Sequence, residues 1–461
     1  MGAGKSTLGP VLAERLGRAF VSIDALVEER TGSSVAELFS ERGEAAFREL
    51  EEAAALDVLT RRPLAVVELG GGALGAKATQ AALAEHAFTV LVEATVEEAW
   101  ERASGSARPL AGHADDFRAL FEQREPRYET VADARARDLD QAVLAAAGVE
   151  IGLGSTARLD ALPGAGPVEL VVDGGVEPLH GDRIRAALGE RLAASHVVPA
   201  GGRAKAAAEA ERLWSALRLD REGTAVALGG GSTIDLTGFV ASAYLRGVAW
   251  VAVPTTLVAQ VDAAIGGKTA VDLPEGKNLV GAFHWPSRVV VDPELLETLP
   301  AEELENGLAE VVKTGLLVGE PLWELDRGEQ VRRCAAAKAA ICLRDPHDRG
   351  ERAQLNLGHT FAHALEAASG FTLPHGTAVA LGLLAAVRLS QLDAEARTVE
   401  EVLRPEPVRV DRDAAWAALT RDKKSGTGSA RLVLLDAPGR PRVGVELDDA
   451  TVRGALDALI A

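Results

Sequence analysis

The chain has 461 residues, and this length predicts two to four domains, because single hydrophobic cores stop growing at about 250 to 300 residues. Its formal net charge of −19 excludes a protein that wraps nucleic acid, since such binding depends on neutralising phosphates. No run reaches the roughly 18 to 20 apolar residues of a membrane-spanning helix, and no secretory signal follows Met1, so a cytoplasmic protein without a membrane partner is expected.

Apolar, β-rich runs alternate with longer segments of helical period through the first 290 or so residues. A first helix is expected at Leu8–Leu16. Strands are expected at Leu64–Leu69, Thr89–Val92, Glu169–Val172, Ala225–Leu228 and Val248–Val253. Such alternation is typical of α/β folds with parallel sheets.

The β-rich runs become rare after about Pro293, where a helical domain is expected to begin. Its helices are predicted at Leu295–Leu325, Gln330–Leu343, Thr360–Ala368 and Ala378–Ala396. The pattern therefore divides the chain into three regions, residues 1–147, 149–290 and 291–461.

A loop rich in glycine opens the first region. Gly2-Ala3-Gly4-Lys5-Ser6-Thr7 stands directly before the first predicted helix. In loops of this kind backbone amides bind phosphate oxygens, the lysine contacts the β- and γ-phosphates, and a hydroxyl contacts Mg²⁺. The motif indicates a site for ATP and Mg²⁺, although a short Gly-Lys-Ser also occurs in ordinary turns.

Further motifs follow in a definite order. They are Phe20-Val21-Ser22-Ile23-Asp24, Phe47-Arg48-Glu49-Leu50-Glu51, Gly70-Gly71-Gly72-Ala73, Arg108-Pro109-Leu110 and Arg124-Glu125-Pro126-Arg127-Tyr128. In this order the motifs resemble the shikimate kinases over nearly all of residues 1–147. The resemblance implies a P-loop kinase-like domain with a parallel sheet, in which Gly2, Ala3, Gly4, Lys5, Ser6 and Thr7 bind ATP, Ser6 contacts Mg²⁺, and Arg108 belongs to a closing lid. It also implies that shikimate is bound by Asp24, Arg48, Gly70, Gly71, Gly72 and Arg124, since arginine forks fit a carboxylate.

Two features depart from the kinase pattern. Ser22 stands where the family usually has an aspartate on the metal side, so the Mg²⁺ contact is expected to be weakened or replaced. A phosphate loop also normally follows a strand and begins with a glycine five positions before Gly4, and residues 1–147 contain neither. The kinase sheet is therefore expected with its first strand missing, which leaves a non-catalytic scaffold as an alternative to a working kinase.

A second glycine cluster lies in the region 149–290. Leu228-Gly229-Gly230-Gly231-Ser232-Thr233-Ile234-Asp235 follows an apolar strand and precedes a predicted helix, where backbone amides can meet a dinucleotide pyrophosphate. Glycine clusters also form tight turns. Three more specific motifs follow: Val253-Pro254-Thr255-Thr256-Leu257-Val258-Ala259-Gln260-Val261-Asp262, Gly266-Gly267-Lys268-Thr269 and Gly276-Lys277-Asn278-Leu279-Val280-Gly281-Ala282-Phe283.

This succession resembles 3-dehydroquinate synthase, and the resemblance spans residues 149–461. It implies a Rossmann-like NAD-binding α/β domain followed by an α-helical metal-binding domain. It further implies NAD contacts from Asp173, Lys205, Gly229, Gly230, Gly231, Asp235, Thr255, Thr256, Lys268, Lys277 and Thr298. Asp262, Lys268 and Asn278 are implied to lie between the nicotinamide and the substrate.

The adenosine side departs from the synthase pattern. The family motifs Asp-x-Asn-Val and Asp-Gly-Glu-x-x-Lys appear here as Asp173-Gly174-Gly175-Val176 and Ala200-Gly201-Gly202-Arg203-Ala204-Lys205. The asparagine and the glutamate have thus become Gly175 and Gly202. Losing two hydrogen bonds of about 1 kcal/mol each is expected to weaken NAD binding by about one to two orders of magnitude.

Three histidines lie close together in the third region. His359 and His363 stand at positions i and i+4 on one helix face, and His375 follows in Pro374-His375-Gly376. Catalytic zinc sites of the His₂Glu type need one carboxylate and keep a position open for substrate. The synthase resemblance implies Glu310, His359 and His375 as ligands of Zn²⁺ or Co²⁺, with His363 kept for proton transfer. Whether His363 is a metal ligand in place of His359 stays open.

The resemblance also implies catalytic cations around a substrate phosphate: Lys268, Lys313, Lys338, Arg352 and one of Lys423 and Lys424, with Lys424 favoured. The implied reaction converts 3-deoxy-arabino-heptulosonate 7-phosphate into 3-dehydroquinate and phosphate, with NAD and a metal, in a homodimer. The expected partners are the small molecules heptulosonate phosphate, shikimate and ATP. A metal-dependent polyol or glycerol dehydrogenase shares the Gly-Gly-Gly-Ser-Thr-Ile-Asp motif, but the joint presence of Lys268, Asn278, Lys338 and Arg352 disfavours it.

Overall fold

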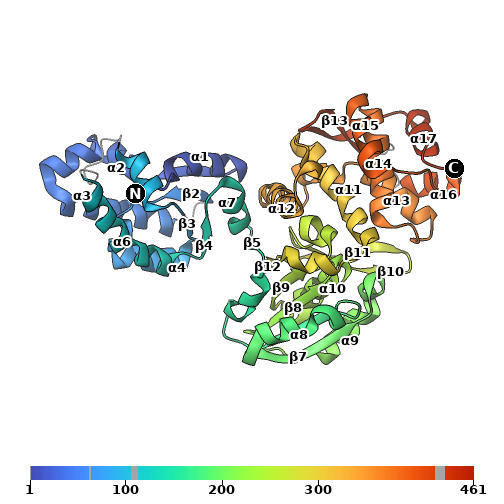
Figure 1. Cartoon of the computed structure of the whole chain (residues 1–461), viewed down its shortest axis with the longest axis horizontal. Coiled ribbons are helices and arrows are strands. Elements are labelled where there is room, and N and C mark those ends of the chain that lie inside the picture. Colours follow the sequence, from blue (N-terminus) through green and yellow to red (C-terminus); the bar gives the residue numbers. More distant parts are fainter. Residues whose placement is uncertain (1, 62–63, 105–112, 163, 421–430) are drawn as a thin grey trace. The chain divides into compact units, whose positions relative to one another are not determined.

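The computed structural model describes residues 2–61, 64–104, 113–162, 164–420 and 431–461 (Figure 1). The chain divides into two compact units, Met1–Ala147 and Gly148–Ala461. Arg108, Lys423 and Lys424 lie outside the described residues. Within the described ranges, no helix has both the length and the apolar character needed to span a membrane.

The first unit alternates helices with short strands. Its elements are α1 (Lys5–Arg15), β1 (Ala19–Ser22), α2 (Ile23–Thr31), α3 (Val35–Thr60), β2 (Ala65–Glu68), α4 (Lys77–His86), β3 (Val90–Val92), α5 (Val96–Ser104), α6 (Ala114–Val131), β4 (Ala134–Ala136) and α7 (Leu139–Ala146). The strands form two parallel pairs, β1 with β2 and β3 with β4, and no backbone ladder joins the pairs in the described part of this unit. All four strands of this unit pair in parallel, as expected for a P-loop kinase-like domain.

Local sequence explains where the helices of the first unit begin. Gly4 has φ 92° and acts as the N-cap of α1, a conformation that glycine adopts without the strain of a Cβ. Ser34 and Glu37 form a reciprocal capping box at the start of α3. Helix α1 packs against β2.

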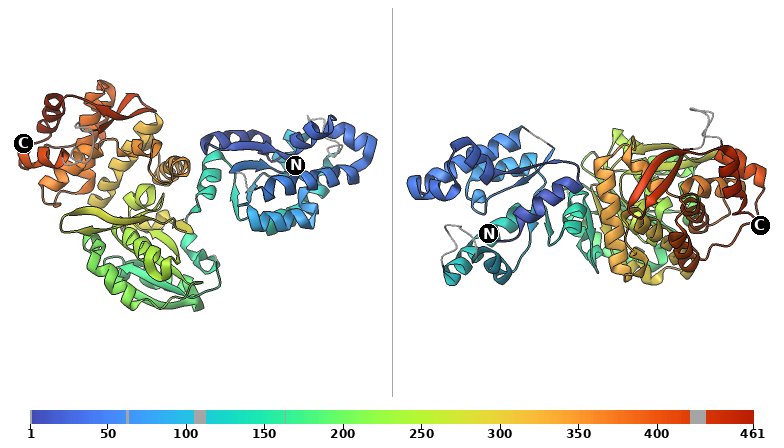
Figure 2. Two further views of the ribbon diagram at one scale, coloured as in Figure 1. Left: turned by 180° about the vertical axis from the view of Figure 1, so that it is seen from behind. Right: turned by 90° about the horizontal axis from the view of Figure 1, so that it is seen from above.

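A six-stranded parallel sheet forms the centre of the second unit. Its strands lie in the order β5 (Val149–Ile151), β12 (Arg288–Val291), β9 (Ala249–Pro254), β8 (Thr224–Gly229), β6 (Val168–Asp173) and β7 (Leu192–Val198). Both β6 and β8 are buried at every position, as expected for parallel strands covered on both faces. The helices α8 (Glu177–Leu188), α9 (Ala207–Ala216) and α10 (Gly231–Ala243) lie beside this sheet (Figures 1 and 2).

The remainder of the second unit is mainly helical. Its helices are α11 (Ala301–Val318), α12 (Arg327–Arg344), α13 (His359–Ala368), α14 (His375–Leu389), α15 (Asp393–Leu403), α16 (Arg412–Leu419) and α17 (Asp449–Asp457). An antiparallel hairpin, β10 (Lys268–Leu273) with β11 (Gly276–Phe283), stands between the sheet and these helices in sequence. The core of the helical part is built chiefly from α11, α13 and α14, with Val312, Phe361 and Leu383 among its fully buried members.

The α/β prediction and the helical third region are confirmed, but two predicted helices are wrong in extent. The segment Leu295–Leu325 holds α11 with a short 3₁₀ turn on either side, because Pro300 cannot continue a helix and caps α11 instead. The segment Ala378–Ala396 contains a turn between α14 and α15, where Gln391 has φ 60°. A second hairpin, β13 (Arg431–Ala437) with β14 (Arg440–Glu446), was not predicted.

Candidate active site

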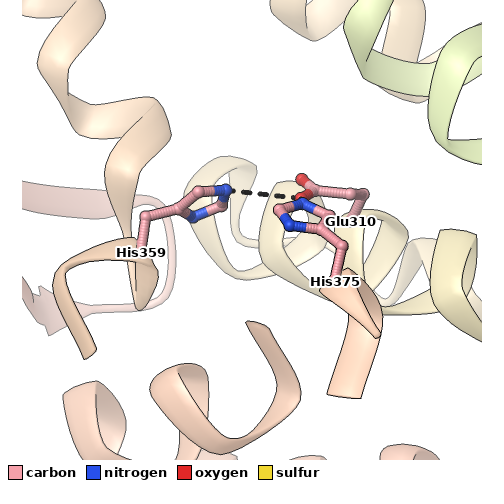
Figure 3. Close-up of side chains that lie close together, drawn as sticks. All are labelled: Glu310, His359 and His375. Carbon is pink, nitrogen blue, oxygen red and sulfur yellow. Dashed lines mark hydrogen bonds and ion pairs between the residues drawn. The ribbon is translucent and has the colours of Figure 1, made fainter. Parts of the chain in front are cut away.

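Three side chains from three helices converge in the helical part of the second unit (Figure 3). Glu310 comes from the middle of α11, His359 from the first position of α13 and His375 from the first position of α14. One ligand atom from each lies within 4.8 Å of the others. His375 Nε2 is 3.1 Å and His359 Nε2 is 3.4 Å from Glu310 Oε1. A carboxylate oxygen and two imidazole nitrogens around one point are a donor set that fits Zn²⁺ or Co²⁺.

The second ring nitrogen of each histidine is held by the chain. His359 Nδ1 lies 3.1 Å from the carbonyl oxygen of Leu357, and His375 Nδ1 lies 3.4 Å from Glu366 Oε1. Such contacts orient the ring and leave Nε2 directed at the shared point, as in metal sites whose histidines are held by outer partners. Burial lowers the pKa of His375, but its contacts with Glu310 and Glu366 outweigh this and raise the pKa to about 9. The pair of carboxylates therefore attracts positive charge to this position.

His363 stands outside this cluster. Its ring centroid is 5.5 Å from that of His359 in an edge-on arrangement, and among the described residues only Glu310, His359 and His375 form the converging group. The protein atoms around the ring and the neighbouring His359 lower the pKa of His363. A neutral imidazole therefore lies beside the cluster, and its role in proton transfer stays a prediction.

Two lysines enclose the carboxylates at the site. Lys313, one turn after Glu310 on α11, forms an ion pair with Glu310 and lies 3.3 Å from Asp262 Oδ2. Lys338 of α12 forms an ion pair with Asp262 and also donates to its backbone carbonyl oxygen at 2.8 Å. Burial alone would raise the pKa of Glu310, but the charge of Lys313 and the nearby His359 hold it well below its usual range. Asp262 itself sits in a π-helical turn, Ala259–Ala263, a feature that often marks functional positions.

Arg352 is buried although it carries a permanent charge. Its exposed fraction is 2%, its Nη1 donates to the carbonyl of Pro346 at 3.2 Å, and its Nε has no hydrogen-bond partner among the described residues. A buried guanidinium nitrogen without a partner is costly unless an anion or water completes it. Lys268, at the start of β10, is more exposed and forms an ion pair with Asp348.

The carboxyl ends of β6 and β8 form the point at which the strand order reverses, since β7 lies on one side of β6 while β8, β9 and β12 follow on the other. Ligands of open α/β sheets bind at this point. Gly229 ends β8 and Gly230 is the N-cap of α10. A Cβ on Gly230 would approach Thr256 at 3.0 Å, so glycine keeps the backbone accessible here. Thr255 is buried, and its Oγ1 has no partner among the described side chains.

The other residues predicted to contact NAD are spread around this edge. Asp173 is bonded to protein groups, because its carboxylate accepts from the amides of Gly175 and Gly201 at 2.8 and 2.9 Å. Lys205 donates to Asp235 at 2.5 Å and also to Asn278.

Two further predicted NAD contacts have partners elsewhere in the unit. Thr298 Oγ1 lies 2.8 Å from His180 Nε2. Lys277 Nζ lies 3.5 Å from Glu366 Oε1, the carboxylate that also contacts His375. The structure thus brings Lys277 toward the metal cluster.

The first unit has a cavity of about 570 Å³, and four of the six predicted shikimate residues line it. Arg48, Gly71, Gly72 and Arg124 line it together with Tyr128, whose hydroxyl donates to the carbonyl of Gly71 at 2.6 Å. A Cβ on Gly72 would meet the guanidinium carbon of Arg48 at 2.2 Å, so the guanidinium can lie here only because residue 72 has no side chain. Asp24 and Gly70 lie at the same end of the sheet, with Asp24 Oδ1 3.0 Å from the position that a Cβ on Gly70 would take.

Some residues that shape these sites were missed by sequence reasoning. Glu366 is 4% exposed and lies seven residues after His359 on the same helix face, a spacing that could have indicated it. Glu51, 1% exposed, pairs with Arg48 at 2.6 Å and ends the motif Phe47-Arg48-Glu49-Leu50-Glu51, in which no role was predicted for it. Asp348, which pairs with Lys268 across 80 positions of sequence, left no local signal.

Comparison with protein-family models gives three matches. The model for the N-terminal part of 3-dehydroquinate synthase matches residues 195–306, and the model for its C-terminal part matches residues 307–425. The model for shikimate kinase matches residues 1–148.

Curated relatives and solved structures agree with these matches. The chain is 41% identical over 350 residues to the 3-dehydroquinate synthase of Symbiobacterium thermophilum, covering 68% of this chain and 97% of the relative. It is 44% identical over 296 residues to that of Gloeobacter violaceus, covering 58% and 81%. Among solved structures, the 2-epi-5-epi-valiolone synthase of Streptomyces hygroscopicus with NAD⁺ and Zn²⁺ is 26% identical with a TM-score of 0.59, covering 68% and 96%. A 2-deoxy-scyllo-inosose synthase, 23% identical with a TM-score of 0.61 and covering 67% and 95%, shares the fold.

Proposed function

The chain belongs to the 3-dehydroquinate synthase family and carries a shikimate kinase domain in residues 1–148, and from this premise we propose how its own residues serve the two reactions. The synthase part converts 3-deoxy-arabino-heptulosonate 7-phosphate into 3-dehydroquinate and phosphate. The kinase part transfers a phosphoryl group from ATP to shikimate. Both reactions belong to the shikimate pathway, and the family assignment removes the polyol dehydrogenase alternative.

The convergence of Glu310, His359 and His375 within 4.8 Å is the observation that carries the synthase proposal. These residues would hold Zn²⁺ or Co²⁺, which when bound polarises the substrate alcohol and the ketone formed from it. Gly229 and Gly230 would hold NAD⁺ at the carboxyl ends of β6 and β8, and the cofactor when bound would supply a reversible acceptor for the hydride of that alcohol carbon. Glu366 and the carbonyl of Leu357 keep both imidazoles in a productive orientation.

His363 is proposed to accept or pass on the alcohol proton. Its lowered pKa keeps the ring neutral at physiological pH, and it lies beside the cluster without belonging to it. Asp262, held between Lys313 and Lys338, is proposed to position these two cations toward the substrate. Asn278 and Lys268 are proposed to line the space between the nicotinamide and the substrate.

The phosphate of the substrate is proposed to meet Arg352 and Lys268, together with Lys424. The unpartnered Nε of buried Arg352 supports this, because a phosphate oxygen would complete it. Lys268 would exchange its pairing with Asp348 for one with phosphate. An arginine fork fixes orientation whereas a lysine acts as a point charge, so the two make different contributions to holding the departing group.

In the kinase part, Gly2 to Thr7 are proposed to bind the phosphates of ATP, with Mg²⁺ contacted by Ser6. Arg48, Arg124 and Asp24 are proposed to hold the carboxylate and hydroxyls of shikimate within the cavity beside Gly70, Gly71 and Gly72. The pairing of Arg48 with Glu51 supports this assignment, because it fixes the guanidinium at the cavity wall. We also propose that the protein is cytoplasmic, and its two free, buried cysteines are compatible with a reducing compartment. The proposed assembly is a homodimer formed through the synthase part.

The decisive assay is the release of inorganic phosphate from the heptulosonate phosphate, with and without a chelator. Replacement His375→Ala should remove bound metal, measured by elemental analysis, and lower the rate by at least about a thousandfold because the site loses a ligand. The variant His284→Ala is the control, since His284 follows β11, its Nε2 lies 3.0 Å from the carbonyl oxygen of Val248, and it is not a member of the converging group. Full phosphate release by a metal-free His375→Ala protein would contradict the synthase site.

A further inference from the structure

Two residues at one edge of the first unit stand directly opposite each other. In the parallel pair of β1 and β2, Ser22 is the register partner of Glu68, and each is the last residue of its strand. Side chains at the carboxyl ends of parallel strands meet at the same edge of the sheet. The position that lacks the usual kinase aspartate therefore faces a carboxylate on the neighbouring strand.

Glu68 is joined to the phosphate loop. Ser6 Oγ, on the first turn of α1, donates a hydrogen bond to Glu68 Oε1 at 2.6 Å across 62 positions of sequence. Ser6 is the hydroxyl of the Gly-Lys-Ser motif, the group that contacts Mg²⁺ in loops of this type. A hydroxyl and a carboxylate oxygen in contact form the kind of hard oxygen pair that Mg²⁺ accepts.

The side chain of Ser22 makes a different contact. Its side chain caps α2 by accepting from the amide of Ala25 at 3.4 Å, which directs the hydroxyl along its own chain. Asp24, two residues further on, has its Oδ1 3.0 Å from the position that a Cβ on Gly70 would take. Neither residue of this segment therefore provides the carboxylate that Ser6 contacts, and Glu68 does.

We propose that Glu68 is the carboxylate of the Mg²⁺ and ATP site, acting with Ser6 in place of the aspartate that Ser22 replaces. The carboxylate has moved from the end of one strand to the opposite residue on the next. A strand-end carboxylate paired with the loop hydroxyl is the general means by which P-loop enzymes hold this cation. The inference rests on the proposed kinase function of residues 1–148.

The test measures metal binding by the full chain in the presence of ADP. Mn²⁺ replaces Mg²⁺ as the probe because its electron paramagnetic resonance signal reports the free ion, and ADP binding without metal is measured by calorimetry. The variant Glu68→Gln keeps the shape and removes the charge, and it should weaken Mn²⁺ binding to the ADP complex at least about tenfold while metal-free ADP affinity changes less than about twofold. The double variant Ser22→Asp, Glu68→Ser returns the carboxylate to β1 and should recover most of the metal affinity.

The control is Glu93→Gln, because Glu93 also follows a strand of this unit but pairs with Arg135 and Arg137. It should leave Mn²⁺ binding unchanged. If Glu68→Gln binds Mn²⁺ as tightly as the parent chain, Glu68 only accepts a hydrogen bond from Ser6 and the proposal is overturned. If the parent chain binds no ADP with or without metal, the proposed kinase function is wrong, and the role of Glu68 is wrong with it. If the parent chain binds ADP without metal but Glu68→Gln does not alter Mn²⁺ binding, only the role of Glu68 is wrong.

Discussion

The imidazoles of His359 and His363 have different surroundings although both belong to α13. His359 has its Nδ1 fixed by the carbonyl of Leu357 and its Nε2 directed at Glu310, whereas no described residue fixes His363 in a comparable way. The position of a histidine within four residues of a metal site therefore does not determine its role. The partner of the second ring nitrogen, which orients the ring, favours His359 over His363 as a metal ligand.

The variants His359→Asn and His363→Asn should separate these roles. His359→Asn should weaken metal binding by at least about tenfold, since a ligand is lost, whereas His363→Asn should retain the metal and lower turnover by about 10² to 10⁴ through the loss of proton transfer. Elemental analysis after dialysis and the rate of phosphate release measure the two quantities. A metal-free His363→Asn protein would reverse the assignment.

Gly202 offers a second test at a single residue. Nothing lies within 4 Å of a Cβ built on Gly202, whereas a Cβ on Gly175 would lie 3.2 Å from Asp173 Oδ1. Gly202→Glu, which restores the acceptor of the family motif, should therefore tighten NAD binding about threefold to tenfold, as expected from one hydrogen bond of about 1 kcal/mol. Gly202→Gln is the matched neutral variant, and calorimetric titration with NAD⁺ measures both. Equal affinities for Gly202→Glu and the parent chain would show that this loop does not reach the cofactor.

At the scale of elements, the spacing of α13 and α14 sets the distance between the two histidines. Both His359 and His375 start their helices, and a Cβ on Gly382 of α14 would meet the carbonyl oxygen of Gly358 at 2.1 Å. The helices can approach this closely only because a glycine lies at the contact. The convergence of His359 and His375 therefore depends on a residue that has no side chain.

Gly382→Ala should separate these helices and disturb the site. Overpacking of this kind costs about 1 to 3 kcal/mol, and the displacement of α13 should also weaken metal binding. Gly454→Ala on α17 is the control, since nothing lies within 4 Å of its Cβ and alanine favours a helix by up to about 1 kcal/mol. Denaturant unfolding and metal titration measure the effects. A Gly382→Ala protein as stable as the parent would show that the helices can slide apart freely.

The elements also show what the sequence could predict. The buried strands β8 and β9 follow from unbroken apolar runs, because strands covered on both faces need no polar alternation, and β6 follows from a run that only Glu169 interrupts. The turn between α14 and α15 could not be predicted, since apolar residues continue in helical period through it. The hairpin of β13 and β14 was missed although Pro438 and Gly439 mark its turn.

The candidate site was predictable where its residues lie in short motifs and unpredictable where folding brings distant residues together. His359 and His375 lie within one stretch of sequence, so their spacing indicated a metal site. The contacts of Lys268 with Asp348 and of Ser6 with Glu68 span 80 and 62 positions. No local pattern encodes such pairs, because they depend on how the sheet and helices pack.

At the scale of the whole molecule, the chain consists of two units, each with its own hydrophobic cores. The core of Ile23, Leu38 and Phe47 belongs to the first unit, and the core around Phe361 and Leu383 belongs to the second. Units with separate cores can unfold separately. Because the metal and NAD sites use residues of the second unit alone, ligands of the synthase should stabilise that unit and leave the first unchanged.

Calorimetry of the full chain should therefore show two transitions that respond to different ligands. Removal of the metal by chelation should lower the midpoint of the Gly148–Ala461 transition alone. NAD⁺ at about a hundred times its Kd should stabilise this unit by about 2.7 kcal/mol, which raises its midpoint by roughly 4 °C. ADP with Mg²⁺ should raise the other transition, and Glu68→Gln should reduce that effect. A single transition shifted equally by NAD⁺ and by ADP would mean that the units unfold as one, and the assignment of separate stabilities would be wrong.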